Sequence, residues 1–167
     1  MPPNVILAAP TSATSSSLVT PALKRDEDQV FTWNEVYHYV STNQIKSIHR
    51  NKQVQTVYNQ WMKDTLNKYG SIENYLLSTK LHFKPIEDKN RPPVIILPND
   101  FPYSVEEGIK HILLWSQIPL SQSYIEEILE ANYGSKTYEW VYFVNPPEIQ
   151  SVRKLPHVHV FMRQRMN

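Results

Sequence analysis

The sequence predicts a protein of the α+β class, in which helices come first along the chain and an antiparallel sheet with one helix follows. In the first half, apolar residues recur at helical spacing behind residue types that cap helices. After Pro93 the apolar runs become short, rich in β-branched and aromatic residues and bounded by proline, as is typical of strands. A chain of 167 residues with 41% hydrophobic residues is long enough for one domain with a buried core.

The first half is predicted to contain three helices. Thr32 and Glu35 form a capping box at the start of the first one. Gly70 ends the second helix, which we expect to kink near Asn51, and Ser71 caps the third. The three helices are expected over residues 32–42, 45–69 and 71–79.

The second half is predicted to contain four strands, with a helix between the second and the third. Ser123 and Glu126 form the capping box of that helix, and Gly134 ends it. The order of elements lacks the regular alternation of strand and helix that makes a doubly wound parallel sheet. The strands are expected over residues 94–97, 109–115, 138–144 and 158–162.

The first 29 residues are predicted to be a disordered tail rich in serine, threonine and proline. The first 23 residues carry no charge, and such a composition buries too little apolar surface to offset the entropy of ordering. We expect a single α+β domain over 30–167, with a helical part over 30–90 and a sheet part over 91–167.

Composition excludes several classes of function. The 17 basic and 16 acidic residues leave a net charge of +1, so no overall field attracts duplex nucleic acid. The absence of cysteine excludes disulfides, thiolate catalysis and zinc ribbons. With 3 glycines the chain forms neither a P-loop nor a dinucleotide-binding fingerprint, and no cofactor is expected.

The sequence also bears on location. No apolar run is long enough to span a membrane, and the first basic residue, Lys24, comes after the short apolar run near the start. We therefore expect no membrane partner and a cytoplasmic location, with the nucleus as a second compartment.

A pair of histidines near the end of the chain is the main chemical signal. In His157-Val158-His159 the two-residue period of a strand puts both imidazoles on one face, where one can activate the other. The alternative is the polar face of a half-exposed strand. A metal site ranks third, since further ligands would have to come from His111, His82 or a carboxylate.

The surroundings of this pair follow a longer pattern, with a strand that carries a histidine, a helix, a strand that ends in asparagine, and then Gln-Ser-Val and His-x-His. The residues are His111, Asn145, Gln150-Ser151-Val152 and His157-Val158-His159-Val160-Phe161. This pattern, over about 94–163, resembles the histidine-triad superfamily of nucleotide hydrolases and transferases, which implies a histidine-triad-like (HIT-like) antiparallel sheet with one crossing helix. Two departures are Phe161 at the third histidine and a longer link over 153–156.

A second resemblance covers essentially everything after the tail. The motifs that carry it are Trp33-Asn34-Glu35, Tyr69-Gly70-Ser71, Leu97-Pro98-Asn99-Asp100-Phe101-Pro102-Tyr103, Gly108-Ile109-Lys110-His111, and Phe143-Val144-Asn145 with the histidine pair. They resemble a fungal family that includes an N-acetylglucosamine-induced protein. The resemblance implies a link to amino-sugar metabolism and carries little mechanism.

The histidine-triad resemblance implies catalytic roles for three histidines. His159 would be the nucleophile that attacks a nucleoside α-phosphate, and His157 would orient it. His111 would complete the cluster. A nucleophilic imidazole must present one ring nitrogen without a proton, so the other nitrogen needs a hydrogen-bond acceptor, usually a backbone carbonyl.

The same resemblance suggests residues that bind the ligand. Asn145 and Ser151, together with Gln150, would hold phosphate oxygens. Arg163 lies on the same strand face as the histidines and would place a cation near phosphate, unless it is an ordinary solvated charge. In the segment that begins with Asn99 and Asp100, the aspartate would bind a sugar hydroxyl, unless both residues only form a turn.

The sequence thus predicts a HIT-like hydrolase or nucleotidyl transferase that acts on a nucleotide or nucleotide-sugar. The alternative, favoured by Phe161, is a non-catalytic regulatory protein that binds such a ligand without turnover. Histidine-triad relatives often pair through a sheet edge, which implies a homodimer.

Overall fold

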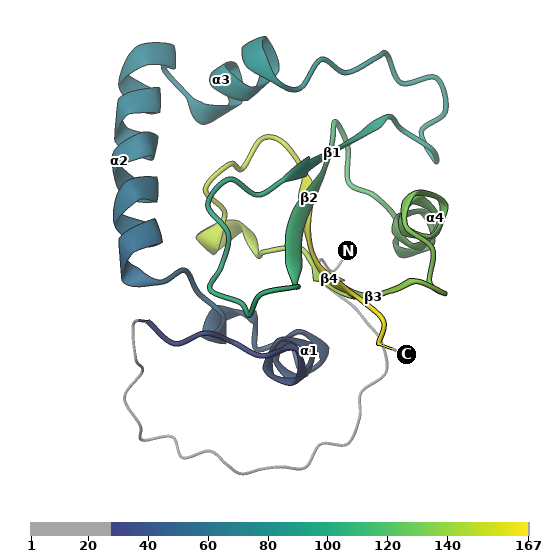
Figure 1. Ribbon diagram of the computed structural model, residues 1–167. Helices are drawn as coiled ribbons and strands as arrows, with labels where there is room; N and C mark the ends of the chain where they lie inside the picture. Colours follow the sequence, from purple (N-terminus) through teal and green to yellow (C-terminus); the bar gives the residue numbers. More distant parts are fainter. Residues whose placement is uncertain (1–27, 167) are drawn as a thin grey trace.

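The computed structural model describes residues 28–166, so the tail expected over 1–29 lies almost wholly outside the described residues. The described part contains four α-helices and one four-stranded antiparallel sheet, which confirms the α+β class (Figure 1). The helices are α1 (Trp33–Ser41), α2 (Lys52–Tyr69), α3 (Ile72–Thr79) and α4 (Gln122–Asn132). The strands are β1 (Val94–Pro98), β2 (Lys110–Ser116), β3 (Tyr138–Phe143) and β4 (His157–Gln164), and the sheet order is β1-β2-β4-β3.

Helix α2 is shorter than the sequence predicts. The expected kink near Asn51 is the start of the helix, because the Asn51 side chain accepts the Val54 N–H at 2.8 Å and caps it. Before it, Ile45–Ser47 form a separate 3₁₀ turn, η2, and the chain is then extended through Asn51. The end at Gly70 is confirmed, since this glycine has φ 83° in the left-handed region.

Helix α4 is capped by Ser121, two residues before the predicted cap Ser123. The hydroxyl of Ser121, in place of Ser123, accepts the Tyr124 N–H at 3.2 Å. The predicted box partner Glu126 instead accepts the indole N–H of Trp140 and the hydroxyl of Tyr142. The glutamate therefore ties α4 to β3.

The two faces of the sheet are covered by different helices (Figure 1). Helix α4 packs on one face, through Ile125 and Leu129. On the other face α1 packs at one end of the sheet and α3 at the other, and these form separate apolar clusters. Between these two clusters the sheet carries the histidines.

Helix α2 lies on the same side of the sheet as α1 and α3 but stands away from the sheet (Figure 1). Thr65 is its one buried residue, and Val57 and Leu66, two of the apolar residues at helical spacing, are 53% and 45% exposed. A helix that packs so little against the core leaves room beneath it. Within residues 28–166 no helix has the length and apolar character to cross a membrane.

The segment before α1 belongs to the fold. Phe31 is 2% exposed, forms a parallel bridge with Val105, and exchanges backbone hydrogen bonds with the 104–106 segment. Its ring packs edge-on against Tyr39 and His49. The fold therefore includes the residue just before the predicted capping box.

We predict that Phe31→Ala lowers the free energy of unfolding by about 3–5 kcal/mol, because it empties a buried aromatic site. Denaturant unfolding monitored by tryptophan fluorescence measures this loss. Val30→Ala, at a neighbouring residue that is 56% exposed, is the control and should change the stability by about 0.5 kcal/mol or less. Equal small effects of both substitutions would show that this segment is not part of the core.

Candidate functional site

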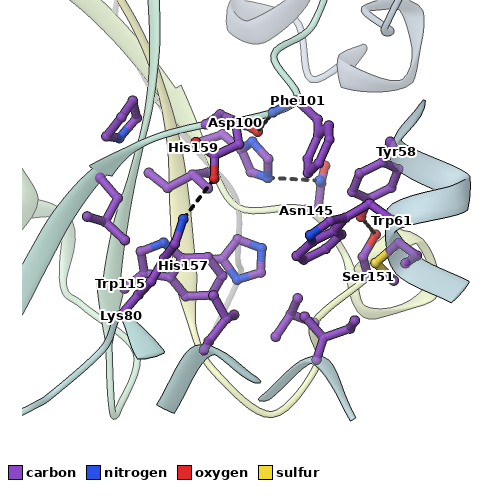
Figure 2. A pocket seen from close by; sticks show the side chains of 18 of the residues that line it. Tyr58, Trp61, Lys80, Asp100, Phe101, Trp115, Asn145, Ser151, His157 and His159 are labelled. Atoms are coloured by element: carbon purple, nitrogen blue, oxygen red, sulfur yellow. Dashed lines mark hydrogen bonds and ion pairs between the residues drawn. The ribbon is translucent and has the colours of Figure 1, made fainter. Parts of the chain in front are cut away.

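A cavity of about 490 Å³ lies between α2 and the sheet (Figure 2). Its volume is in the range of small-molecule sites, and its walls are mainly aromatic and aliphatic. Helix α2 contributes Tyr58, Trp61 and Met62, and the sheet contributes Leu97, Leu113, Trp115, His157 and His159. The polar groups that line it include Arg50, Lys80, Asn99, Asp100, Asn145 and Ser151.

The pairing of β2 with β4 brings the three predicted histidines together. Trp115 lies opposite His157, Leu113 opposite His159, and His111 opposite Phe161. All of these side chains share the face that points toward α2, since alternate residues of a strand share a face. The prediction that His157 and His159 share a face is confirmed, but the half-exposed strand is wrong, because His159 is 5% exposed.

The imidazole of His157 is held in one tautomer. Its Nδ1 lies 2.9 Å from the carbonyl oxygen of Leu155, and a carbonyl only accepts, so Nδ1 carries the proton and donates it. In the neutral ring Nε2 therefore keeps its lone pair. Within the described residues no hydrogen bond reaches this Nε2, and the ring lines the cavity, stacked on Trp115 at 4.5 Å.

The other two histidines form a directional chain of hydrogen bonds. The backbone N–H of Tyr103 donates to Nδ1 of His111 at 3.2 Å, so the proton of neutral His111 is on Nε2. That Nε2 lies 2.9 Å from Nδ1 of His159 and donates to it. The amide nitrogen of Asn99, at 3.4 Å from the same Nε2, is too distant to compete.

The chain ends at Asn145. Because Nδ1 of His159 accepts, the proton of His159 is on Nε2, which lies 3.2 Å from the Asn145 side-chain amide (Figure 2). A ring N–H needs an acceptor, so the amide oxygen faces the ring, an orientation reached by a 180° turn of the amide. Nε2 of His159 therefore carries a proton and donates a hydrogen bond, whereas a nucleophilic nitrogen must have a free lone pair.

The surroundings keep all three imidazoles neutral at pH 7. Burial lowers the pKa of His111 to about 3, with a smaller contribution from the charge of Arg50. Burial, and then the charges of His111, His157 and Arg50, hold the pKa of His159 well below its ordinary value. Burial also lowers the pKa of His157, against a smaller opposing effect of the hydrogen bond to Leu155.

Arg50 is a site residue that the sequence analysis missed. It lies in the extended segment before α2, and its Nε donates to the carbonyl of Phe101 at 2.7 Å. Its guanidinium carbon lies 3.9 Å from the ring centre of Tyr58 and 5.2 Å from that of Tyr103. No motif marks this arginine, because the loop over 99–103 and α2 meet only in the fold.

The segment after β1 contributes an ion pair to the rim of the cavity. Asp100 accepts from Nζ of Lys80 at 3.0 Å, and the two side chains are 59% and 38% exposed (Figure 2). The amide oxygen of Asn99 accepts the N–H of Phe101 at 2.9 Å, which is the expected turn interaction. Both predicted residues line the cavity, and Asp100 already has a cationic partner.

The remaining predicted residues are placed differently from one another. Ser151 lines the cavity and its hydroxyl accepts from Tyr58 at 2.5 Å, which joins α2 to the loop before β4. Gln150 donates to the backbone carbonyl of Asn145 at 2.6 Å and supports that loop from outside the cavity lining. Arg163 is directed away from the cavity, where it pairs with Glu139 at 2.8 Å and lies over Trp33.

Phe161 lies beside the histidine cluster, which was also considered as a metal site. Phe161 is fully buried and contacts His111 with a ring distance of 4.4 Å, so the third position of the pattern is a packing position here. Within the part of the chain that the structure describes, no three His, Asp or Glu side chains gather as a metal site. His82 is exposed and lies outside the cavity lining.

Comparison with known proteins identifies the family. Residues 32–163 match the family described as "Protein of unknown function (DUF3605)". The chain belongs to this family. Relatives in fungi include the N-acetylglucosamine-induced protein 1 of Candida albicans, 30% identical over 89% of this chain and 74% of that protein. The uncharacterized protein YPL067C of Saccharomyces cerevisiae is 24% identical over 83% of this chain and 81% of its own length.

A solved structure shares the fold. The crystal structure of HTC1 superposes with a TM-score of 0.58 and 23% sequence identity, over 80% of this chain and 85% of that chain. This likeness supports the architecture alone. Membership of the DUF3605 family confirms the second resemblance found in the sequence.

We predict that the three site histidines show two tautomers at pH 7. Long-range ¹H–¹⁵N correlation spectra distinguish Nδ1–H from Nε2–H rings. We expect Nδ1–H for His157, because its donor faces the Leu155 carbonyl, and Nε2–H for His111 and His159. An Nδ1–H form of His159 would contradict the directional chain.

We predict that the buried imidazoles make stability fall as the pH falls below 6.5. The unfolded chain binds a proton on each histidine near pH 6.5, whereas native His111 does so near 3, so acid favours the unfolded state within that window. Between pH 6 and pH 5 the neutral imidazole of His111 costs about 1.4 kcal/mol per pH unit. His111→Gln should flatten the measured slope of unfolding free energy by about this amount.

The control for that titration is His82→Gln, which removes an exposed histidine outside the cavity. The parent protein and both variants are unfolded by denaturant at several pH values. An unchanged slope in His111→Gln would show that His111 is not the buried neutral group described above.

Proposed function

We propose that the cavity binds a nucleotide or nucleotide-sugar and that the protein is a HIT-like hydrolase or nucleotidyl transferase. The observation that carries the proposal is the tautomer of His157, whose Nε2 lone pair lines the cavity while Nδ1–H donates to Leu155. This is the arrangement required of a nucleophilic imidazole. The proposal therefore moves the nucleophile from His159, the residue that the sequence pattern favours, to His157.

The proposed chemistry proceeds in two displacements. In the first, Nε2 of His157 forms a bond to the α-phosphorus, and the bond from phosphorus to the leaving-group oxygen breaks, with its electron pair on that oxygen. The positive charge of the ring is stabilised by the Leu155 carbonyl at Nδ1–H. In the second, water or an acceptor hydroxyl attacks phosphorus, the P–N bond breaks with its electron pair on Nε2, and the proton of the attacking group is released.

The walls of the cavity are suited to a ligand that contains a planar base or a sugar ring. Tyr58, Trp61, Phe101 and Trp115 present aromatic surface, and such surface stacks on bases and sugar faces. Ser151 and Asn145 place a hydroxyl and an amide in the same lining, which are groups that bind phosphate and hydroxyl oxygens. The name of the Candida relative suggests that the ligand is connected with N-acetylglucosamine.

A second candidate function is a regulatory protein that binds the same ligand without turnover. The observation that favours it is the locked state of His159, which donates to Asn145, together with the packing role of Phe161. In this case His157 would only accept a hydrogen bond from the ligand.

We predict that incubation with a panel of nucleotides and nucleotide-sugars gives a covalent adduct of nucleotidyl mass in the parent protein. Acid-free intact-protein mass spectrometry preserves the phosphoramidate and detects it. His157→Gln should reduce adduct and product formation by about a hundredfold or more, because the attacking lone pair is lost. His159→Gln should retain both within about tenfold.

The controls separate chemistry from folding and from fast turnover. Melting temperatures of both variants are measured in parallel, and product release is followed in the same samples. An adduct that maps to His159 would contradict the proposal. Ligand-dependent stabilisation with neither adduct nor product would favour the non-catalytic candidate.

A further inference from the structure

The lining of the cavity has more positive than negative charges, and the unbalanced positive charge is that of Arg50. Its Nε donates to the Phe101 carbonyl, and within the described residues no carboxylate pairs with its guanidinium. The side chain is partly buried and lines the cavity. A cation that is partly removed from water without a counter-ion has lost part of its solvation, so this position favours an anion from outside the chain.

The other charged groups of the lining cancel one another. Lys80 and Asp100 form an ion pair at 3.0 Å. The lining histidines, His157 and His159, have lowered pKa values and are neutral at pH 7. The lining of the cavity therefore carries one net positive charge, which belongs to Arg50.

The geometry leaves the far edge of the guanidinium available. With Nε bound to Phe101, the two Nη groups remain for a ligand, and paired N–H groups match two oxygens of a phosphate. Tyr58 and Tyr103 flank the guanidinium and fix its plane. The pocket end that contains His159 lies near this charge, since the ring of Tyr103 is 5.2 Å from the guanidinium carbon and 5.7 Å from the His159 ring.

We propose that Arg50 is the anchor of a singly charged phosphate, and that the ligands of this cavity are phosphodiesters rather than phosphomonoesters. A phosphodiester group held at Arg50 carries one charge, which Arg50 balances. A monoester carries two near neutral pH and would leave one uncompensated in a mainly apolar cavity. This inference rests on the proposed function only in that both place a phosphate ester in the same cavity.

Three small probes that share a 4-nitrophenyl group test the charge requirement. They are 4-nitrophenyl phosphate, its methyl diester, and the neutral 4-nitrophenyl methyl ether, which carry two, one and no negative charges at pH 8. Dissociation constants are measured by calorimetry with His157→Gln, so that no covalent step contributes. We expect the diester to bind about tenfold or more tightly than the ether and more tightly than the monoester.

Substitutions then assign the preference to Arg50. Arg50→Met should weaken binding of the diester by about 10–100-fold and leave the neutral ether unchanged, since a charge-assisted pair is lost. Arg50→Lys should restore part of the affinity. Lys63→Met removes an exposed cation of α2 outside the cavity lining and should change nothing.

A second variant keeps the test decisive if Arg50→Met does not fold. Asp100→Asn, at a side chain that is 59% exposed, raises the net charge of the lining by one. It should shift the preference toward the monoester by about tenfold. Stronger binding of the monoester than of the diester by His157→Gln, or no shift with Asp100→Asn, would overturn the inference.

The two proposals fail separately. If the diester preference depends on Arg50 but neither adduct nor product forms, the proposed chemistry is wrong and the anion site stands. If adducts form at His157 but the affinity does not depend on Arg50, the anion site is wrong and the proposed chemistry stands.

Discussion

The candidate site depends on the register between β2 and β4. This pairing sets His111 and His159 diagonally across two central strands, and Trp115 directly against His157. Both faces of the sheet are covered, so the two histidines at its centre are buried and must satisfy their ring nitrogens within the protein. A shift by one residue would turn the imidazoles toward α4 and remove the site.

One backbone group then decides the protonation of the cluster. The backbone N–H of Tyr103 can only donate a hydrogen bond. It therefore fixes the donor and acceptor of each later hydrogen bond in the chain, from His111 to His159 and from His159 to Asn145. The carbonyl of Leu155 has only lone pairs, and it sets the opposite tautomer in His157. Two histidines that alternate along one strand are thereby given different chemistry, one as a buried donor and one with a lone pair in the cavity.

Much of the architecture could be predicted from the sequence. Helix ends with a strong local signal were correct, as at Thr32 and Gly70, where the capping groups act within a few residues. The wrong cap at Ser123 shows the limit, because Glu126 has a tertiary use on β3 that no local pattern reveals. The apolar period of α2 predicted a helix but not its place in the fold, where Tyr58 and Trp61 form the wall of a cavity.

The sequence predicted which residues form the site better than it predicted the role of each residue. Spacing on β4 placed the histidine pair on one face, and family motifs pointed to Asn99, Asp100 and Asn145. Which histidine has the free nitrogen depends on hydrogen bonds with the backbone groups of Leu155 and Tyr103. The residue pattern does not specify these hydrogen bonds, because they are set by the conformation of the loops before β4 and after β1. Arg163 follows the strand period but is attracted by Glu139, whereas Arg50 enters the cavity from a segment with no signal.

Reaction with diethyl pyrocarbonate tests most directly the claim that His157 is the reactive imidazole, because the reagent acylates an accessible, unprotonated ring nitrogen. Peptide mapping of the folded protein at pH 7 gives a rate for each histidine. We predict that His157 is modified at least about tenfold faster than His159 and His111, and that a denatured sample removes the difference. Equal or faster modification of His159 in the folded protein would contradict the account.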